Sequence, residues 1–161
     1  MEIRQAHAGD AADIAAIWNW MITETLWTFT TVEKTVPEIA AMIGRGADAG
    51  GTFVAATGGQ ISGFVTYGQF RDGPGYARTA EHSIVLRPDA GGGGLGRGLM
   101  AAAEDHARAH DRHSMIAGAS GANPRGIAFH AALGYRECAR MPEIGFKNGT
   151  WLDLVLMQKI L

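Results

Sequence analysis

The residues with the clearest chemical signature are the glycines between positions 91 and 98, a run interrupted only by Leu95 and Arg97. Residues 80–86 before the run favour a strand, and residues 95–110 favour a helix rich in Ala, Leu and Met. Glycine lets the backbone approach a ligand closely, and the free N–H groups at a helix N-terminus bind anions. The segment therefore predicts a phosphate or pyrophosphate site, with a flexible surface loop as the alternative.

Two known phosphate-binding motifs fit this segment poorly. Gly91, Gly93 and Gly96 have the G-x-G-x-x-G spacing of dinucleotide-binding folds, but that motif opens a parallel βαβ unit in which an acidic residue ends the next strand. Here the segment follows strands predicted to be antiparallel, and no such acidic residue is evident. The Lys and the Ser or Thr of a P-loop are also missing, which disfavours hydrolysis of ATP or GTP.

The elements that must position this loop alternate in type along the chain. Ile14, Ile17, Trp18 and Met21 have the spacing of an amphipathic helix, and Asp10 is a plausible cap for it. Strands are predicted at 2–7, 52–56, 60–70, 114–119, 135–141 and 151–158. A second helix should begin at a capping box of Thr35 and Glu38 and end at about Arg45. Another should begin at Asn123 and Pro124 and end near Gly134.

These elements predict an α/β domain of α+β type, in which about four helices cover a mixed sheet of about seven strands. Strands should be parallel only where a helix crosses over between them. The 161 residues fit a single domain, residues 1–161. A chain of that length buries roughly two thirds of its unfolded surface without help from a metal or a disulfide.

Composition narrows the choice of partner. The chain has 14 Lys and Arg against 16 Asp and Glu, a net charge of −2, so it has no strong field to gather nucleic acid or an acidic membrane. We expect a small-molecule substrate, no nucleic acid, no membrane and no metal. The single cysteine, Cys138, cannot form an intrachain disulfide, and the start of the chain lacks the apolar stretch of a signal peptide. Both features favour a cytoplasmic protein.

Several separated segments resemble one family. The order of the elements, the loop at 91–96 and the helix opened by Asn123 resemble the GNAT N-acetyltransferase superfamily, whose acyl-CoA signature is Q/R-x-x-G-x-G/A. The segments FRDGPGYARTAEHSIVL (70–86), AFHAALGY (128–135) and GFKNGTWLDLVLMQ (145–158) are similar to the branch that acetylates phosphinothricin and methionine sulfoximine. The resemblance covers nearly the whole chain and implies the GNAT fold and a homodimer.

The resemblance also assigns residues to acetyl-CoA, the implied co-substrate. The strand at 84–86 would pair its backbone with the pantetheine arm, as an added strand pairs with a free edge. The glycine loop would cradle the pyrophosphate, and Asn123 would contact the cofactor while capping its helix. A strand N–H near Val85 could stabilise the oxyanion. The full set is Ile84, Val85, Leu86, Gly92, Gly93, Gly94, Leu95, Gly96, Arg97 and Asn123.

Glu81 matches the acidic residue that serves this branch as general base. An amine acceptor is protonated near neutral pH, with a lysine-like pKa of about 10, and only its free lone pair attacks a thioester carbon. A carboxylate nearby removes that proton directly or through one water, and burial would raise its pKa toward the working pH. The alternative is a solvated carboxylate on a strand. His82 should point to the opposite face of the strand and have a structural role.

Two other side chains have competing interpretations. Many GNAT enzymes have a tyrosine that protonates the departing thiolate at the position where this branch, like this chain, has a histidine, His130. His130 either donates that proton or packs and hydrogen-bonds near the sulfur. Acetyl-CoA is already activated, so no covalent nucleophile is required, and Cys138 is expected to be a small buried residue.

The acceptor site is assigned by the same resemblance. A guanidinium at Arg71 would suit an amino acid carboxylate, and Phe29, with Trp27, could wall the side-chain pocket or simply pack in the core. Gly91 stands where the signature has Arg or Gln, which predicts weaker CoA binding that Gly91→Arg should tighten. Ala77 and Arg78 replace a typical Arg-His pair, which bears on substrate preference. The acceptor set is Phe29, Arg71, Gly73, Pro74 and Gly75.

The function expected from these features is acetyl-CoA dependent N-acetylation of the α-amine of a small amino acid analogue, such as phosphinothricin, methionine sulfoximine or methionine sulfone, by direct attack in a ternary complex. Two alternatives stay open. One is an acetyltransferase of the same fold for a polyamine, an aminoglycoside or a protein N-terminus. The other is a non-catalytic module that binds an acyl-CoA or nucleotide and regulates a partner.

Overall fold

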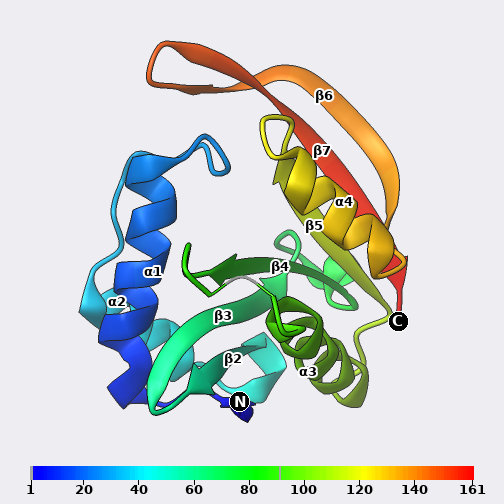
Figure 1. Ribbon diagram of the computed structural model, residues 1–161. Coiled ribbons are helices and arrows are strands. Elements are labelled where there is room, and N and C mark those ends of the chain that lie inside the picture. The colour runs from blue at the N-terminus through cyan, green and yellow to red at the C-terminus, as the bar shows by residue number, and fades with distance from the viewer. Residues whose placement is uncertain (1, 91) are drawn as a thin grey trace.

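The computed structural model describes residues 2–90 and 92–161, which form a seven-stranded mixed sheet with helices on both faces (Figure 1). The strand order is β1-β2-β3-β4-β5-β7-β6. The strands are β1 (Glu2–Gln5), β2 (Gly50–Thr57), β3 (Gln60–Gln69), β4 (Thr79–Leu86), β5 (Ser114–Ser120), β6 (Arg136–Lys147) and β7 (Thr150–Ile160), and the helices are α1 (Ala11–Glu24), α2 (Val36–Ile43), α3 (Leu95–Ala109) and α4 (Pro124–Ala132). The predicted mixed sheet and four helices are confirmed.

Each face of the sheet has its own apolar core. Helix α3 buries Leu99 and Met100 on one face, where they pack with Val65 of β3. Helices α1 and α2 bury Ile14 and Ile39 on the other face. β4 and β5 are parallel and are joined through α3, whereas every other neighbouring pair of strands is antiparallel. The expectation that strands are parallel only across a helix is confirmed.

The caps predicted from the sequence have different outcomes. Thr35 and Glu38 form the expected capping box, in which the N–H of Thr35 donates to the Glu38 carboxylate at 2.8 Å. Asp10 occupies the N-cap position of α1, but its side chain makes no cap hydrogen bond there. Its carboxylate instead accepts two hydrogen bonds from Arg4, at 2.7 and 2.8 Å, and one from the N–H of His7. The predicted cap at Asp10 is therefore wrong, because a guanidinium competes for the carboxylate.

The last two strands are longer than the sequence predicts. The expected strand at 135–141 becomes β6, which continues to Lys147. The pairing with β7 shifts register between Met141 and Gly145, where Pro142 lies and Glu143 adopts a φ of 51°. Proline removes a ladder donor and is tolerated at a bulge of an edge strand. The predicted strand therefore does not end at 141 but continues through a bulge, and β6 and β7 form one long hairpin (Figure 1). Within the described residues, no helix is long and apolar enough to span a membrane.

Candidate active site

The centre of the sheet contains an opening between two neighbouring strands. β4 and β5 pair only from Thr79–His82 to Ser114–Ala117, although β4 runs on to Leu86 and β5 to Ser120. β4 stays paired with β3 as far as Leu86. We call this opening the fork; Figure 1 shows the two strands separating at it. Within the fork, the end of β4 has no strand partner on its β5 side.

The free edge of β4 presents a particular set of peptide groups. The N–H of Arg87 donates to the carbonyl of Ser62 at 2.9 Å, toward β3. Since peptide groups alternate in direction along an antiparallel strand, the N–H of Val85 also faces β3, and the peptide groups of Ile84 and Leu86 face the fork. The N–H of Val85 itself is thus directed away from the opening, and the N–H groups near it that face the fork belong to Ile84 and Leu86.

Two adjoining cavities of about 260 and 310 Å³ occupy the fork. They share Met21 and Trp27 from the α1 side, Ile84 from β4, and Asn123 and His130 from α4. Asn123 does two things here, because its side chain caps α4 through the N–H of Gly126 at 2.9 Å and also lines both cavities. Both expectations for Asn123 are compatible with this position.

The glycine loop ends in the conformation that anion binding requires. Gly92, Gly93 and Gly94 have φ values of 94°, 66° and 77°, a left-handed region that other residues enter at a cost. Gly94 precedes α3 without any side-chain cap, so the first N–H groups of this helix are left free. Successive N–H groups in such a turn form a concave anion site. The residues at 92–97 therefore fit a pyrophosphate, while Gly91 lies outside the described residues.

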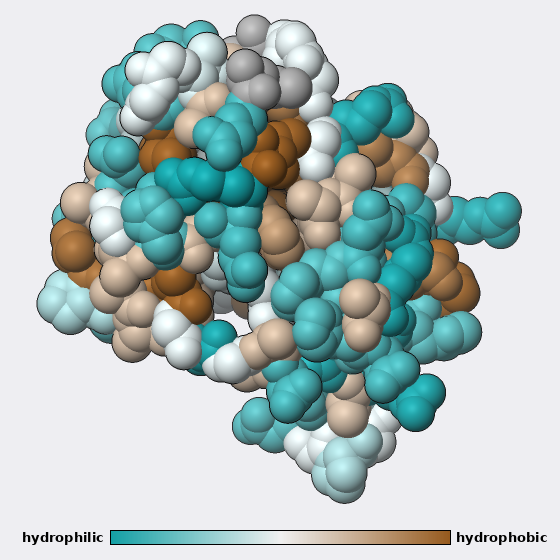
Figure 2. Space-filling model, turned by 90° about the horizontal axis from the view of Figure 1, so that it is seen from below, coloured by the Kyte–Doolittle hydropathy of each residue, from teal (hydrophilic) through white to brown (hydrophobic). Residues whose placement is uncertain are grey.

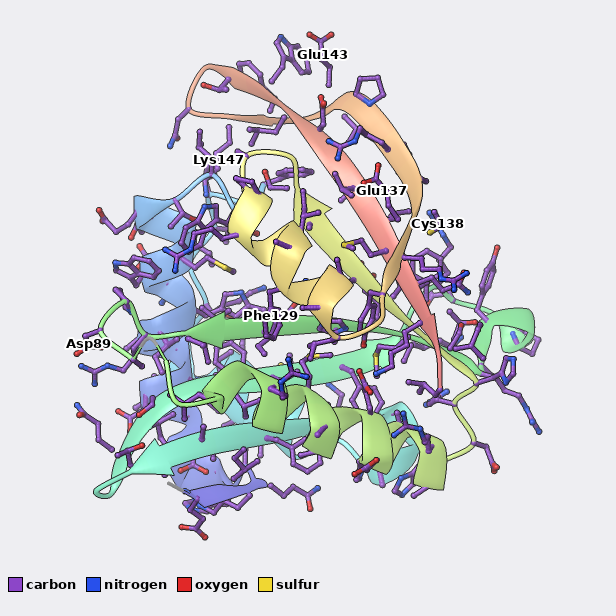
Figure 3. The ribbon with its side chains drawn as sticks, turned by 45° about the vertical axis from the view of Figure 1, so that its right-hand side comes forward. Asp89, Phe129, Glu137, Cys138, Glu143 and Lys147 are labelled. Carbon is purple, nitrogen blue, oxygen red and sulfur yellow. The ribbon has the colours of Figure 1, made fainter. Side chains whose placement is uncertain are left out.

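Gly96 has a packing role in addition to its place in the loop. A Cβ at this position would lie 3.0 Å from the ring of Phe129, and Gly96 and Phe129 line the same cavity of the fork. Figure 3 shows Phe129 on the side of α4 that faces β4 and α3. The small residue therefore lets α3 and α4 approach closely on one side of the opening.

Glu81 lies on β4, one residue before the last residue that pairs with β5, and is half-buried. It lines a hollow of about 230 Å³ together with Trp18, Tyr67 and Ser83. Burial raises the pKa of the Glu81 carboxyl, and the positive charge of Arg71 opposes that rise. A carboxylate with a raised pKa is suited to accept and release a proton near neutral pH.

The strand opposite Glu81 is shaped to accommodate its carboxylate. Gly118 of β5 faces Glu81, and a Cβ there would lie 3.0 Å from Glu81 Oε1. Sequence reasoning overlooked Gly118, although an isolated glycine within a strand is a known sign of close approach by another group. Trp18, Met21 and Lys34 also line the fork and were overlooked, because on α1 the first two match an ordinary core stripe.

His82 points to the face opposite Glu81 and meets His130. Their Nε2 atoms are 2.9 Å apart, and Nδ1 of His130 is 2.8 Å from the carbonyl oxygen of Gly126. A carbonyl only accepts, so Nδ1 of His130 bears a proton. Burial lowers the pKa of His130, and burial with the adjacent His130 lowers the pKa of His82 to about 3. Both rings are thus neutral at pH 7, and His82 must donate its Nε2 proton to Nε2 of His130.

Several predicted site residues lie elsewhere. Phe29 packs against β6, where a Cβ at Gly145 would be 2.6 Å from its ring, and the loop residues that line the fork are Trp27, Thr28 and Thr30. Arg71 is exposed near Glu81. The exposed turn that follows it lines none of the described cavities, so the structure does not bring its members to Glu81; they are Gly73, Pro74 and Gly75.

Cys138 corrects a prediction about burial. It was expected to be buried, but it is exposed, because β6 forms the edge of the sheet with solvent on one side (Figure 3). Its thiol donates to the carbonyl of Leu156 at 3.3 Å. Across residues 2–90 and 92–161, no group of three or more His, Cys, Asp or Glu side chains is arranged to hold a metal ion.

Comparison with known proteins decides the family. The model of the acetyltransferase (GNAT) family matches residues 14–135. The chain belongs to this family. The fork, the uncapped N-terminus of α3 and the acidic residue on β4 are therefore features of a GNAT acetyltransferase, and the resemblance noted from the sequence is confirmed.

Two curated relatives are similar over almost the whole GNAT chain. The L-amino acid N-acyltransferase of Escherichia coli is 36% identical over 160 residues, which cover 98% of this chain and 92% of the relative. The L-methionine sulfoximine/L-methionine sulfone acetyltransferase of Salmonella typhimurium is also 36% identical, with 98% and 93% covered. The solved structure of a phosphinothricin acetyltransferase from Sinorhizobium meliloti in complex with acetyl-CoA has a TM-score of 0.91 and 31% identity, and covers 99% of this chain and 88% of that one.

Proposed function

We propose that this GNAT enzyme transfers an acetyl group from acetyl-CoA to the α-amine of a small amino acid analogue, by direct attack in a ternary complex. The observation that carries the proposal is that β4 leaves β5 after His82, one residue beyond Glu81. The same strand thereby provides a half-buried carboxylate and, within a few residues, free peptide groups that can pair with the amide-containing arm of acetyl-CoA. The named relatives support an acceptor of the methionine sulfoximine and methionine sulfone type.

The donor side of the site is built from backbone. When bound, acetyl-CoA supplies an activated thioester. We assign the N–H groups of residues 92–97 to its pyrophosphate and the free edge at Ile84 and Leu86 to its amide-containing arm. Asn123 and Phe129 of α4 wall the same opening. Holding two reactants in register supplies much of the acceleration of a bimolecular step.

The acceptor side provides the base. We assign Glu81 to removal of one proton from the acceptor ammonium, directly or through one water, so that the nitrogen lone pair becomes free. Its raised pKa and its position at the fork support this role. Arg71, exposed nearby, is assigned to the carboxylate of the acceptor.

His130 is better suited to hold the site than to protonate a thiolate. Its Nδ1 proton is directed to Gly126 and its Nε2 lone pair to His82, so the neutral ring has no spare proton to give. A thiol has a pKa of about 8.5, so its anion is a tolerable leaving group near neutral pH. We therefore propose the packing role for His130 over the general-acid role.

Other amines and a non-catalytic module are less well supported. A polycationic acceptor favours an acidic surface, whereas the net charge here is −2 and Arg71 lies beside Glu81. On the face that Figure 2 shows, hydrophilic residues surround scattered hydrophobic ones, and there is no broad apolar patch. A half-buried carboxylate at the fork would have no purpose in a module that only binds acyl-CoA.

We also propose a homodimer in the cytoplasm. The β6–β7 hairpin extends beyond the helices (Figure 1) and exposes Ile144, Phe146 and Trp151 at 55%, 56% and 60%. Exposed apolar clusters of this kind mark interaction surfaces, and the unpaired thiol of Cys138 suits a reducing compartment. Sedimentation of the purified protein tests the dimer.

A thiol-release screen tests the proposed function. Acetyl-CoA is offered with methionine sulfoximine, methionine sulfone, phosphinothricin, a polyamine, an aminoglycoside and a peptide, with propionyl-CoA and succinyl-CoA as donor controls. Release of CoA with the amino acid analogues and with acetyl-CoA supports the proposal. Release with only the polyamine, aminoglycoside or peptide, or with none of the amines, overturns it.

A further inference from the structure

Lys147, the last residue of β6, is a buried cation that the proposed mechanism does not use. Its side chain is only 2% exposed. Its Nζ donates to the carbonyl oxygens of Ile22, Thr25 and Thr28 at 2.6, 2.9 and 3.0 Å. Figure 3 shows Lys147 between the end of α1 and the β6–β7 hairpin. All three N–H groups of the ammonium are therefore used by one short stretch of chain.

That stretch is the end of α1 and the loop after it. The last carbonyls of a helix lack partners within the helix and carry a partial negative charge. An ammonium at this point satisfies them and holds the loop residues that follow. Every hydrogen-bond partner of Nζ is a backbone carbonyl, so the contact fixes the path of the main chain rather than one side chain. Burial lowers the pKa of Lys147.

The same strand holds the loop at a second point. Gly145, two residues before Lys147, lies under the ring of Phe29, and a Cβ there would be 2.6 Å from that ring. Residues i and i+2 of a strand share a face, so one face of β6 contacts the loop at 25–30 twice. The same short loop presents Trp27, Thr28 and Thr30 to the fork.

We propose that Lys147 is a positioning residue that fixes the acceptor side of the site by holding the loop at 25–30 against β6. The inference rests on the proposed function, since it takes the fork as the place where the amine acceptor meets Glu81. The strand that carries Lys147 belongs to the hairpin with the exposed apolar residues, so a contact on that hairpin is linked through this loop to acceptor binding.

The test compares the buried Lys147 with the half-buried Lys159. Lys147→Met should raise KM for the acceptor about tenfold and change kcat and the Kd of acetyl-CoA by less than about twofold. The control is Lys159→Met on the neighbouring strand β7, which removes a 2.6 Å ion pair with Glu104 of α3, away from the loop. The control should lose stability without a change in acceptor KM.

Hydrogen exchange separates this inference from the proposed function. Amides in residues 22–30 should exchange faster in Lys147→Met and at the wild-type rate in Lys159→Met, whether or not any acceptor is turned over. Gly145→Ala, which displaces Phe29 and leaves Lys147 intact, should raise the same exchange and the same KM. Unchanged exchange at 22–30 in both Lys147→Met and Gly145→Ala, or faster exchange with an unchanged acceptor KM, overturns the inference.

Discussion

The Nε2 atoms of His82 and His130 lie 2.9 Å apart, and His82 donates to His130. The direction of this hydrogen bond follows from the carbonyl of Gly126, which accepts the single ring proton of His130 at Nδ1 and leaves Nε2 as an acceptor. The two neutral rings thus connect β4 to α4 on one side of the fork. Protonation of either ring would place a charge in a buried site, which links the pair to the response of the protein to acid.

Stability should fall on mild acidification because of His82. Its pKa is about 3 in the folded protein and about 6.5 when unfolded, so below pH 6.5 the unfolded chain takes up a proton that the folded chain refuses. This proton uptake lowers the free energy of unfolding by about 1.4 kcal/mol for each pH unit below 6.5, which amounts to about 2 kcal/mol at pH 5. His82→Gln keeps an N–H donor and removes the titration. Urea unfolding at pH 7 and pH 5 should show a smaller acid loss in the variant; equal losses would contradict the assignment.

Replacing His130 should cost little catalysis. His130→Gln retains an acceptor for the His82 N–H, so we expect kcat to fall less than about tenfold, whereas loss of a true general acid costs about 10²–10⁴. Steady-state rates at saturating substrate decide between these values. A loss of a hundredfold or more, with the alkaline limb of the pH profile abolished, would restore His130 as the proton donor.

Glu81→Gln should abolish most turnover and leave the donor site intact. The expected fall in kcat is about 10²–10⁴, with an unchanged Kd for acetyl-CoA by calorimetry. Burial raises the pKa of Glu81, so its carboxylate takes up a proton at a higher pH than an ordinary glutamate does. Wild-type activity should therefore begin to decline at that higher pH as the solution is acidified. This acid limb should vanish in the variant. Thiol release at the wild-type rate would show that Glu81 is not the base.

A methyl group at position 118 should act on Glu81 from the opposite strand. Gly118→Ala places a Cβ 3.0 Å from Glu81 Oε1, so the carboxylate must move, and we expect kcat/KM to fall about tenfold or more. Gly46→Ala is the control, since a Cβ there meets nothing within 4 Å. Equal activity of both variants would mean that the carboxylate has freedom to shift without consequence.

Local patterns predict most of the fold. The capping box at Thr35 and the cap at Asn123 were readable because they depend on residues three positions apart. The cap predicted at Asp10 was wrong because it depends on a contact outside the local pattern. Arg4 binds the Asp10 carboxylate once the chain has folded. The strand predicted at 135–141 was too short, because β6 continues past Pro142 through a bulge and pairs again with β7.

The parts of the site that a local motif marks were predictable, whereas contacts between residues far apart in the sequence were not. The glycine loop was found from its residue types between a predicted strand and a predicted helix, whereas Glu81 was found through the resemblance to a known family. The contact of His82 with His130 joins residues 48 positions apart, and the contact of Lys147 with Ile22 joins residues 125 apart. No periodicity encodes such separations, so the resemblance could point to His130 but not to its contact with His82, and Lys147 was not singled out.

Four residue pairs join β4 to β5, so the two parts of the sheet on either side of the opening share only a short stretch of strand pairing. A compound seated in the opening touches both parts, so occupancy should resist their separation and raise the melting temperature in proportion to the logarithm of its concentration. Heat tolerance in the cell would then track the supply of that compound, and the unliganded protein would be the form that proteases encounter first.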